Sequence, residues 1–239
     1  MLDYLRFQMD HHTADLKPSE RPARDEAGEI VLDAVRRGRL SESRAVENLY
    51  MVAVGIRDAS MFHPVDIDEI LIVHDLAQKL KLGMVVRKCG NLVHKVFLFA
   101  NEDRMPDIPD IYENVGFENF IIAQIAIARM SGEILDFPEC CMKSFVGHLM
   151  QGTDQDRAAT EALRKEPDPD PDAYFVERFV PCRPRCDRAI SIGRKITSDL
   201  YRTDPQIASI YQKLKREHMK EVRIGSIVEE KQRRDGAVP

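Results

Sequence analysis

Four of the chain's five cysteines lie in two tight pairs, which form the most concentrated set of reactive side chains in the sequence. Cys140 and Cys141 are adjacent, and Cys182 and Cys186 follow about forty residues later. Cysteine thiolates bind zinc and iron–sulfur clusters, whereas scattered core cysteines would not be expected to pair in this way. The four cysteines therefore predict a metal site that holds either zinc or an iron–sulfur cluster.

The residues around each pair indicate helix starts. Because proline is favoured in the first turn of a helix, helices are expected to begin near Pro138 and Pro184, with Asp136 as the cap of the first. A thiol near a helix N-terminus has a lowered pKa, which raises the fraction of thiolate available to bind a metal. If the two pairs form one site, sulfurs of one pair should lie within about 4 Å of sulfurs of the other.

The spacing within the first pair is unusual for a zinc site, since zinc fingers use C-x₂₋₄-C pairs at both ends. Adjacent residues point about 100° apart on a helix, so Cys140 and Cys141 should converge on one ion with difficulty. An open arrangement is therefore favoured, in which three cysteines hold the ion and Cys140 or Cys141 tolerates serine. His148 lies about 10 Å along the helix from Cys141, which argues against it as a ligand.

Two other interpretations of the cysteines stay open at this point. The thiols could belong to a redox dithiol, or they could only staple a structural or interaction module. A thiol enzyme is the main alternative, because residues 182–188 (CRPRCDR) match the C-x₅-R loop of cysteine phosphatases. The match lacks a glycine that would let the loop wrap an anion, and Pro181 and Ala189 replace the expected histidine and hydroxyl residue. Whether the chain is an enzyme is left undecided.

The elements that must position these residues are mostly helical. Apolar repeats predict helices from Ile30 onward, over 41–55 with Ser41 and Gly55 as caps, over 66–82 and over 205–223. Gly83 is expected to end the helix over 66–82. The segment 117–132 is apolar on nearly all sides and is expected to be a buried central helix.

β-Branched and aromatic runs on both sides of Gly90-Asn91 predict a β-hairpin, since these two residues tolerate a tight turn. The far end of its second strand is apolar on both faces and should be covered. Cys89 and His94 flank the turn, but two residues are too few to hold a metal. We therefore expect both to take no part in the cysteine site.

Together these patterns predict an α+β fold, mostly helical with a small antiparallel β-hairpin or sheet packed on the helices. Residues 1–28 are expected to form a flexible arm, 29–222 a single domain with the cysteine site at 137–193, and 223–239 a charged tail. The Asp/Pro run 166–172 is expected to be an exposed extended loop, because prolines two apart cannot propagate a helix.

Composition narrows the classes of function. The net charge of -5 argues against a general nucleic-acid binder. No apolar run approaches the roughly 20 residues that a membrane span needs, and charges interrupt the start of the chain as they would not in a signal peptide. We therefore expect a cytoplasmic protein with no membrane association, in which the thiols stay reduced. The composition leaves open whether the chain forms a homo-oligomer.

The cysteine region resembles an uncharacterised, mainly archaeal family known as domain-of-unknown-function 483. The resemblance is specific over about 130–195, and the matching residues are Phe137, Pro138, Cys140, Cys141, Pro181, Cys182, Cys186, Ser191 and Gly193. The chain departs from the pattern at Val180, where a histidine would be expected. The resemblance implies that the four cysteines form one site, and it implies no particular activity.

Overall fold

The computed structural model describes residues 21–63, 66–89, 93–100, 120–153 and 158–236, the last range without 159–160, 164, 167 and 177–178. The chain divides into two compact units. The first contains residues 1–123 and 200–207, and the second contains residues 124–199 and 208–239. The single domain expected over 29–222 stays a prediction.

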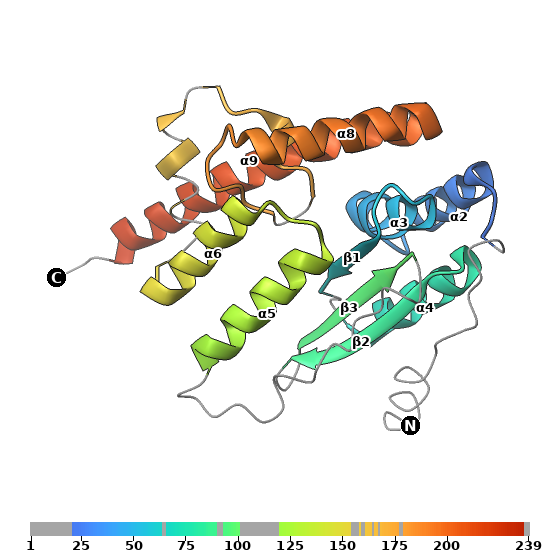
Figure 1. The fold of residues 1–239 in the computed structure, drawn as a ribbon, viewed down its shortest axis with the longest axis horizontal. Helices are drawn as coiled ribbons and strands as arrows, with labels where there is room; N and C mark the ends of the chain where they lie inside the picture. Colours follow the sequence, from blue (N-terminus) through green and yellow to red (C-terminus); the bar gives the residue numbers. More distant parts are fainter. Residues whose placement is uncertain are drawn as a thin grey trace. The chain divides into compact units, whose positions relative to one another are not determined.

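The first unit contains a three-stranded antiparallel sheet in the described part of the chain (Figure 1). Its strands are β1 (Ala59–Phe62), β2 (Gly83–Cys89) and β3 (Val93–Phe99), in the order β1-β3-β2. β2 and β3 pair up to Cys89 opposite Val93, which confirms the hairpin. The turn residues Gly90-Asn91 and the side chains of Cys89 and His94 lie outside the described residues, so their predicted roles stay predictions.

The sheet is covered as its sequence requires. Val96, Phe97, Leu98 and Phe99 of β3 are each at most 1% exposed, so both faces of this strand are buried at its far end. A strand that buries successive side chains must be packed on both sides. The expectation from the apolar pattern is confirmed here.

The helices of this unit are α2 (Arg24–Arg36), η2 (Arg44–Tyr50), α3 (Met51–Ala53) and α4 (Ile67–Leu80). The Ser41 hydroxyl accepts a hydrogen bond from the Arg44 amide, and Asp66 caps α4 through the Glu69 amide. The predicted Ser41 cap is therefore confirmed. The prediction that Gly83 ends α4 is wrong, because Lys81 adopts the left-handed conformation at the helix end and Gly83 begins β2.

Two features of these helices differ from the sequence pattern. α2 begins at Arg24, inside the segment 1–28 that was expected to be an arm, and it buries Ala27. Residues 1–20 lie outside the described part. The helix expected over 41–55 is a π-helix through most of its length, from Arg44 to Tyr50.

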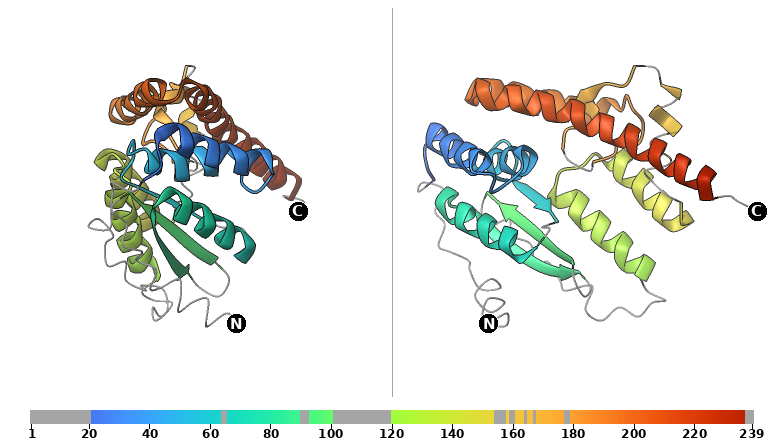
Figure 2. Two further views of the ribbon diagram at one scale, coloured as in Figure 1. Left: turned by 90° about the vertical axis from the view of Figure 1, so that its right-hand side faces the viewer. Right: turned by 180° about the vertical axis from the view of Figure 1, so that it is seen from behind.

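The second unit contains all of α6 (Glu139–Gln151) and η5 (Pro171–Ala173). It also contains most of α5 (Phe120–Ile134), α8 (Asp187–Thr203) and α9 (Pro205–Gly236). The prediction of a helix buried on nearly all sides is wrong for α5, because Ile122 is 67% exposed. α9 includes 223–236, which is most of the segment 223–239 that was expected to form a charged tail. Figure 2 shows the segment before α8 lying close to the start of α6.

The Asp/Pro run is the clearest difference within the second unit. Its last two residues belong to η5, a 3₁₀ turn that Asp170 caps. The run continues directly into Ala173, Tyr174 and Phe175, which are at most 1% exposed. The expectation of an exposed extended loop is therefore wrong at this end, because apolar side chains pull the segment into the core.

The fold class is nevertheless α+β, as the sequence predicts. In the part of the chain that the structure describes, none of the helices combines the length and the apolar character that a membrane crossing requires.

Candidate metal centre

Two helix starts bring the cysteines into position. α6 begins at Glu139 directly after Pro138, so Cys140 and Cys141 lie in its first turn. The expected cap is wrong: Pro138 takes the cap position, and Asp136 adopts a φ of 58° two residues earlier. α8 begins at Asp187, so Cys186 immediately precedes it. Cys182 lies in the turns before α8, and Pro184 also precedes the helix rather than opening it, contrary to expectation.

The four sulfurs lie within 4.8 Å of one another. Cys186 Sγ is 3.6 Å from Cys140 Sγ and 3.7 Å from Cys141 Sγ, and the two adjacent sulfurs are 4.0 Å apart. Around a tetrahedral ion with Zn–S bonds near 2.3 Å, neighbouring sulfurs lie about 3.8 Å apart. The predicted proximity of the two pairs is confirmed, and the four cysteines could hold a metal ion.

The adjacent cysteines converge, although helical geometry argued against it. Both lie in the first turn of α6, where no preceding turn of helix restricts the side-chain rotamers. This freedom lets the two thiols turn toward the same point. The expectation that adjacent cysteines converge with difficulty is therefore wrong here, and whether one of the two would be left out of a metal site stays a prediction.

Burial and hydrogen bonds shift the pKa values of three of the thiols in different directions. Burial raises the pKa of Cys141 well above its usual range. Burial, followed by the hydrogen bond and the charge of Cys186, raises the pKa of Cys182 to about 11. Burial also acts on Cys186, but hydrogen bonds from the Ala189 amide and from the neighbouring thiols outweigh it and lower the pKa of that thiol. Of Cys141, Cys182 and Cys186, the last is thus the thiol that best carries a negative charge in the metal-free chain.

The backbone contributes two further contacts to the site. The Cys182 amide donates a hydrogen bond to Cys141 Sγ at 3.4 Å, which connects the two pairs directly. The Ala189 amide is the third of α8, so its contact with Cys186 is an N-cap interaction made by sulfur. Amide-to-sulfur hydrogen bonds stabilise thiolates, which are the form that binds metals.

An aromatic cluster lies next to the cysteine pairs. Phe137 and Phe179 each stand three residues before a cysteine pair. Their ring centroids are 4.8 Å apart, and Phe175 lies 4.4 Å from Phe179 and 6.0 Å from Phe137. The cluster therefore packs together the two chain segments that precede the cysteine pairs. The sequence gives a signal for Phe137 and Phe179 in their matching offsets, whereas no local pattern indicates Phe175.

Other residues considered from the sequence fall outside the sulfur group. His148 Nδ1 lies 2.9 Å from the Thr153 hydroxyl at the far end of α6, so the expectation that it is no ligand agrees with its contacts. Arg188 is exposed, and the pKa of Cys182 is raised rather than lowered. Both observations argue against a phosphatase loop, which needs a thiolate nucleophile and an arginine directed at the anion.

Gly193, a residue of the family pattern, has a clear structural reason. A Cβ atom at this position would lie 2.0 Å from the carbonyl oxygen of Asp172. The Asp/Pro segment therefore lies directly on α8, and only glycine permits this approach. Ser191 of the same pattern is exposed on α8.

Comparison with known proteins identifies the same region of the chain. The family described as "Protein of unknown function (DUF483)" matches residues 108–215, a stretch that contains all four cysteines. The resemblance to this family is confirmed. An uncharacterized protein of Methanocaldococcus jannaschii, MJ1106, is 34% identical to this chain in an alignment of 65 residues that covers 26% of the chain. The chain spans about a third, 35%, of the length of that curated relative. No solved structure matches the chain.

Proposed function

We propose that the chain is a zinc protein whose Cys140, Cys141, Cys182 and Cys186 hold one tetrahedral ion in a closed four-sulfur site. The observation that supports this most strongly is the mutual approach of the four sulfurs to within 4.8 Å. Their closest separations of 3.6 to 4.0 Å are similar to the distance of about 3.8 Å expected between two sulfurs that bind the same tetrahedral zinc ion.

The same distances favour a single ion over an iron–sulfur cluster. In a cluster, the cysteines are divided among two or four iron atoms, and bridging sulfides occupy the space between the irons. Cysteine sulfurs around a cluster must therefore spread outward, whereas these four enclose a volume suited to one ion. Tetrahedral four-sulfur coordination is a preferred arrangement for zinc. The spacing of the sulfurs, rather than their type, thus favours zinc over the cluster that the sequence left open.

The proposed role of the ion is structural. Cys141 and Cys186 are buried, and all four sulfurs are directed at one another, so no position is left for a substrate. A closed site of this kind contributes its binding free energy to folding, because the unfolded chain does not preassemble the ligands. The ion would join the start of α6 to the turns before α8, two segments about forty residues apart.

We also propose that the protein works in a reducing compartment, in agreement with the cytoplasmic location expected from the sequence. The four cysteines are free thiols in close contact. In an oxidising compartment, thiols at such separations would be prone to form disulfides in place of a metal site.

The test is purification without oxygen or chelators, followed by elemental analysis and a visible spectrum. The proposal expects one zinc per chain and a colourless protein. Iron with inorganic sulfide and absorbance near 400 nm would replace zinc with a cluster. A metal-free chain that stays folded and binds neither zinc nor cobalt would contradict metal binding itself.

A further inference from the structure

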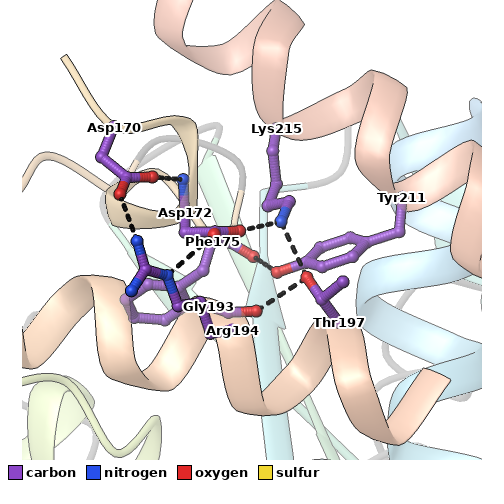
Figure 3. Close-up of polar contacts among 8 residues, drawn as sticks. All are labelled: Asp170, Asp172, Phe175, Gly193, Arg194, Thr197, Tyr211 and Lys215. Carbon is purple, nitrogen blue, oxygen red and sulfur yellow. Dashed lines mark hydrogen bonds and ion pairs between the residues drawn. The ribbon is translucent and has the colours of Figure 1, made fainter. Parts of the chain in front are cut away.

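The segment from Asp170 to Phe175 is fastened to α8 and α9 by a polar cluster (Figure 3). We propose that α9 positions the metal centre through two residues, Lys215 and Tyr211, which hold this segment against the cysteine pairs. The proposal rests on the metal site proposed above. It assigns a role to a helix that contributes no metal ligand.

Lys215 is the anchor of the cluster. Lys215 is fully buried, and its ammonium group pairs with the Asp172 carboxylate. The same ammonium donates a hydrogen bond to the Thr197 hydroxyl at 2.7 Å and lies 5.0 Å from the centre of the Tyr211 ring. A fully buried charge is strongly unfavourable unless it is paired, so Lys215 requires Asp172 to remain where it is.

Asp172 in turn connects the anchor to the second cysteine pair. Its carbonyl oxygen lies on Gly193 of α8, the helix that begins directly after Cys186. The Asp170 carboxylate accepts a hydrogen bond from the Asp172 amide at 2.9 Å, and the Asp170 amide reaches the Pro184 carbonyl at 3.4 Å. Pro184 lies between Cys182 and Cys186, so this chain of contacts ends within the metal-binding turns.

Tyr211 reaches the cysteines by a different route. Its hydroxyl donates a hydrogen bond to the Phe175 carbonyl at 2.7 Å, and both residues are at most 1% exposed. The Phe175 ring packs on Phe137 and Phe179, the two residues that precede the cysteine pairs. Tyr211 and Lys215 are four residues apart on α9 and therefore share one face of the helix. That face holds the supporting segment at Asp172 and at Phe175.

Residues that orient metal ligands through intermediate contacts commonly change metal affinity about 10- to 100-fold when they are replaced. We therefore expect Lys215→Met to weaken zinc binding by about this factor, and Tyr211→Phe by about tenfold or less, because it removes one hydrogen bond and keeps the ring. The visible d–d bands of the cobalt-loaded chain report the ligand geometry. In both variants these bands should shift from their wild-type energies.

Two controls separate positioning from stability. Leu214→Ala removes a buried side chain next to Lys215 and should lower the melting temperature while leaving the cobalt spectrum unchanged. Tyr50→Phe removes the hydroxyl of a fully buried tyrosine in the first unit and should leave zinc affinity unchanged. Tyr211→Phe is conservative enough to fold, so the comparison holds even if Lys215→Met does not.

The proposal is overturned if Tyr211→Phe keeps wild-type zinc affinity and an unshifted cobalt spectrum. It is equally overturned if Leu214→Ala shifts the spectrum as much as Lys215→Met does, since the effect would then follow stability alone. A wild-type chain that forms no thiolate–cobalt complex would instead contradict the proposed metal site, and the two failures are thus distinguishable.

Discussion

In the first unit, β1, β2 and β3 satisfy their backbone groups in a sheet, and Phe97, Leu98 and Phe99 bury their side chains with at most 1% exposure. The second unit differs between α6 and α8. There the described residues form a short helical stretch within 158–165, the 3₁₀ turn η5 and irregular turns, and their contacts include the sulfur group, an aromatic cluster and a buried ion pair. The described core of the first unit is therefore mainly apolar, whereas this part of the second unit adds specific polar contacts and the cysteine group that we propose to bind zinc.

Sensitivity to metal should therefore lie mainly in the second unit. Apolar burial is spread over many side chains and tolerates the loss of one of them at a limited cost. A metal site concentrates its stabilisation in a few ligands. Removing the metal should therefore unfold or loosen the second unit while the sheet of the first unit keeps its structure.

The largest expected effect comes from the ligands themselves. Cys→Ser changes at Cys140, Cys141, Cys182 or Cys186 should each abolish stoichiometric zinc binding and lower the melting temperature by about 10 °C or more. The four losses should be similar, because all four sulfurs belong to one group. Cys89→Ser is the matched control and should keep both zinc and stability. Calorimetry with metal analysis checks this, and one cysteine that tolerates serine would restore the open arrangement.

The next largest effect is expected when a buried phenylalanine is replaced in each unit. Phe175 in the second unit and Phe97 in the first are each 1% exposed. Replacing either by alanine should destabilise the chain by about 3–5 kcal/mol. Only Phe175→Ala should also weaken zinc binding, because its ring packs on the residues that precede both cysteine pairs. Competition with a coloured chelator measures the affinity. Equal zinc affinities in the two variants would remove the distinction between the units.

A third effect concerns pH. Burial holds the pKa of Cys141 above its usual range and raises the pKa of Cys182 to about 11, so both are protonated in the metal-free chain near neutral pH. Zinc must displace these protons, and its affinity should therefore rise with pH by about 100-fold per unit if two protons leave. Zinc titrations between about pH 6 and pH 8, followed with a pH-indicator dye, measure the number of protons released. Zinc binding that releases none would contradict this description of the thiols.

The sequence predicted the features that arise from short-range patterns. Ser41 marked a helix start because its hydroxyl satisfies a free amide, and the runs beside Gly90-Asn91 predicted the pairing of β2 with β3. The sequence also predicted that the two cysteine pairs lie together, because closely spaced cysteines are typical of a shared site. Such patterns act within a few residues and can be read directly.

The features that the sequence did not predict arise from tertiary contacts. β1 is four residues long, too short to show alternation, and it is defined by its pairing with β3. The ion pair of Lys215 and Asp172 joins residues 43 positions apart, and Asp172 belonged to a run that resembled an exposed loop. The convergence of Cys140 and Cys141 depended on rotamers at a helix start, which spacing alone does not reveal.

The most direct test of the four-sulfur site is X-ray absorption at the zinc edge of the chain purified without oxygen or added chelator. A closed site should give a first shell of four sulfurs at about 2.3 Å from zinc, with no nitrogen or oxygen. A shell with fewer sulfurs and a light atom would contradict the closed site. Absence of zinc, with iron–iron scattering in the corresponding iron spectrum, would show that the four cysteines hold a cluster instead.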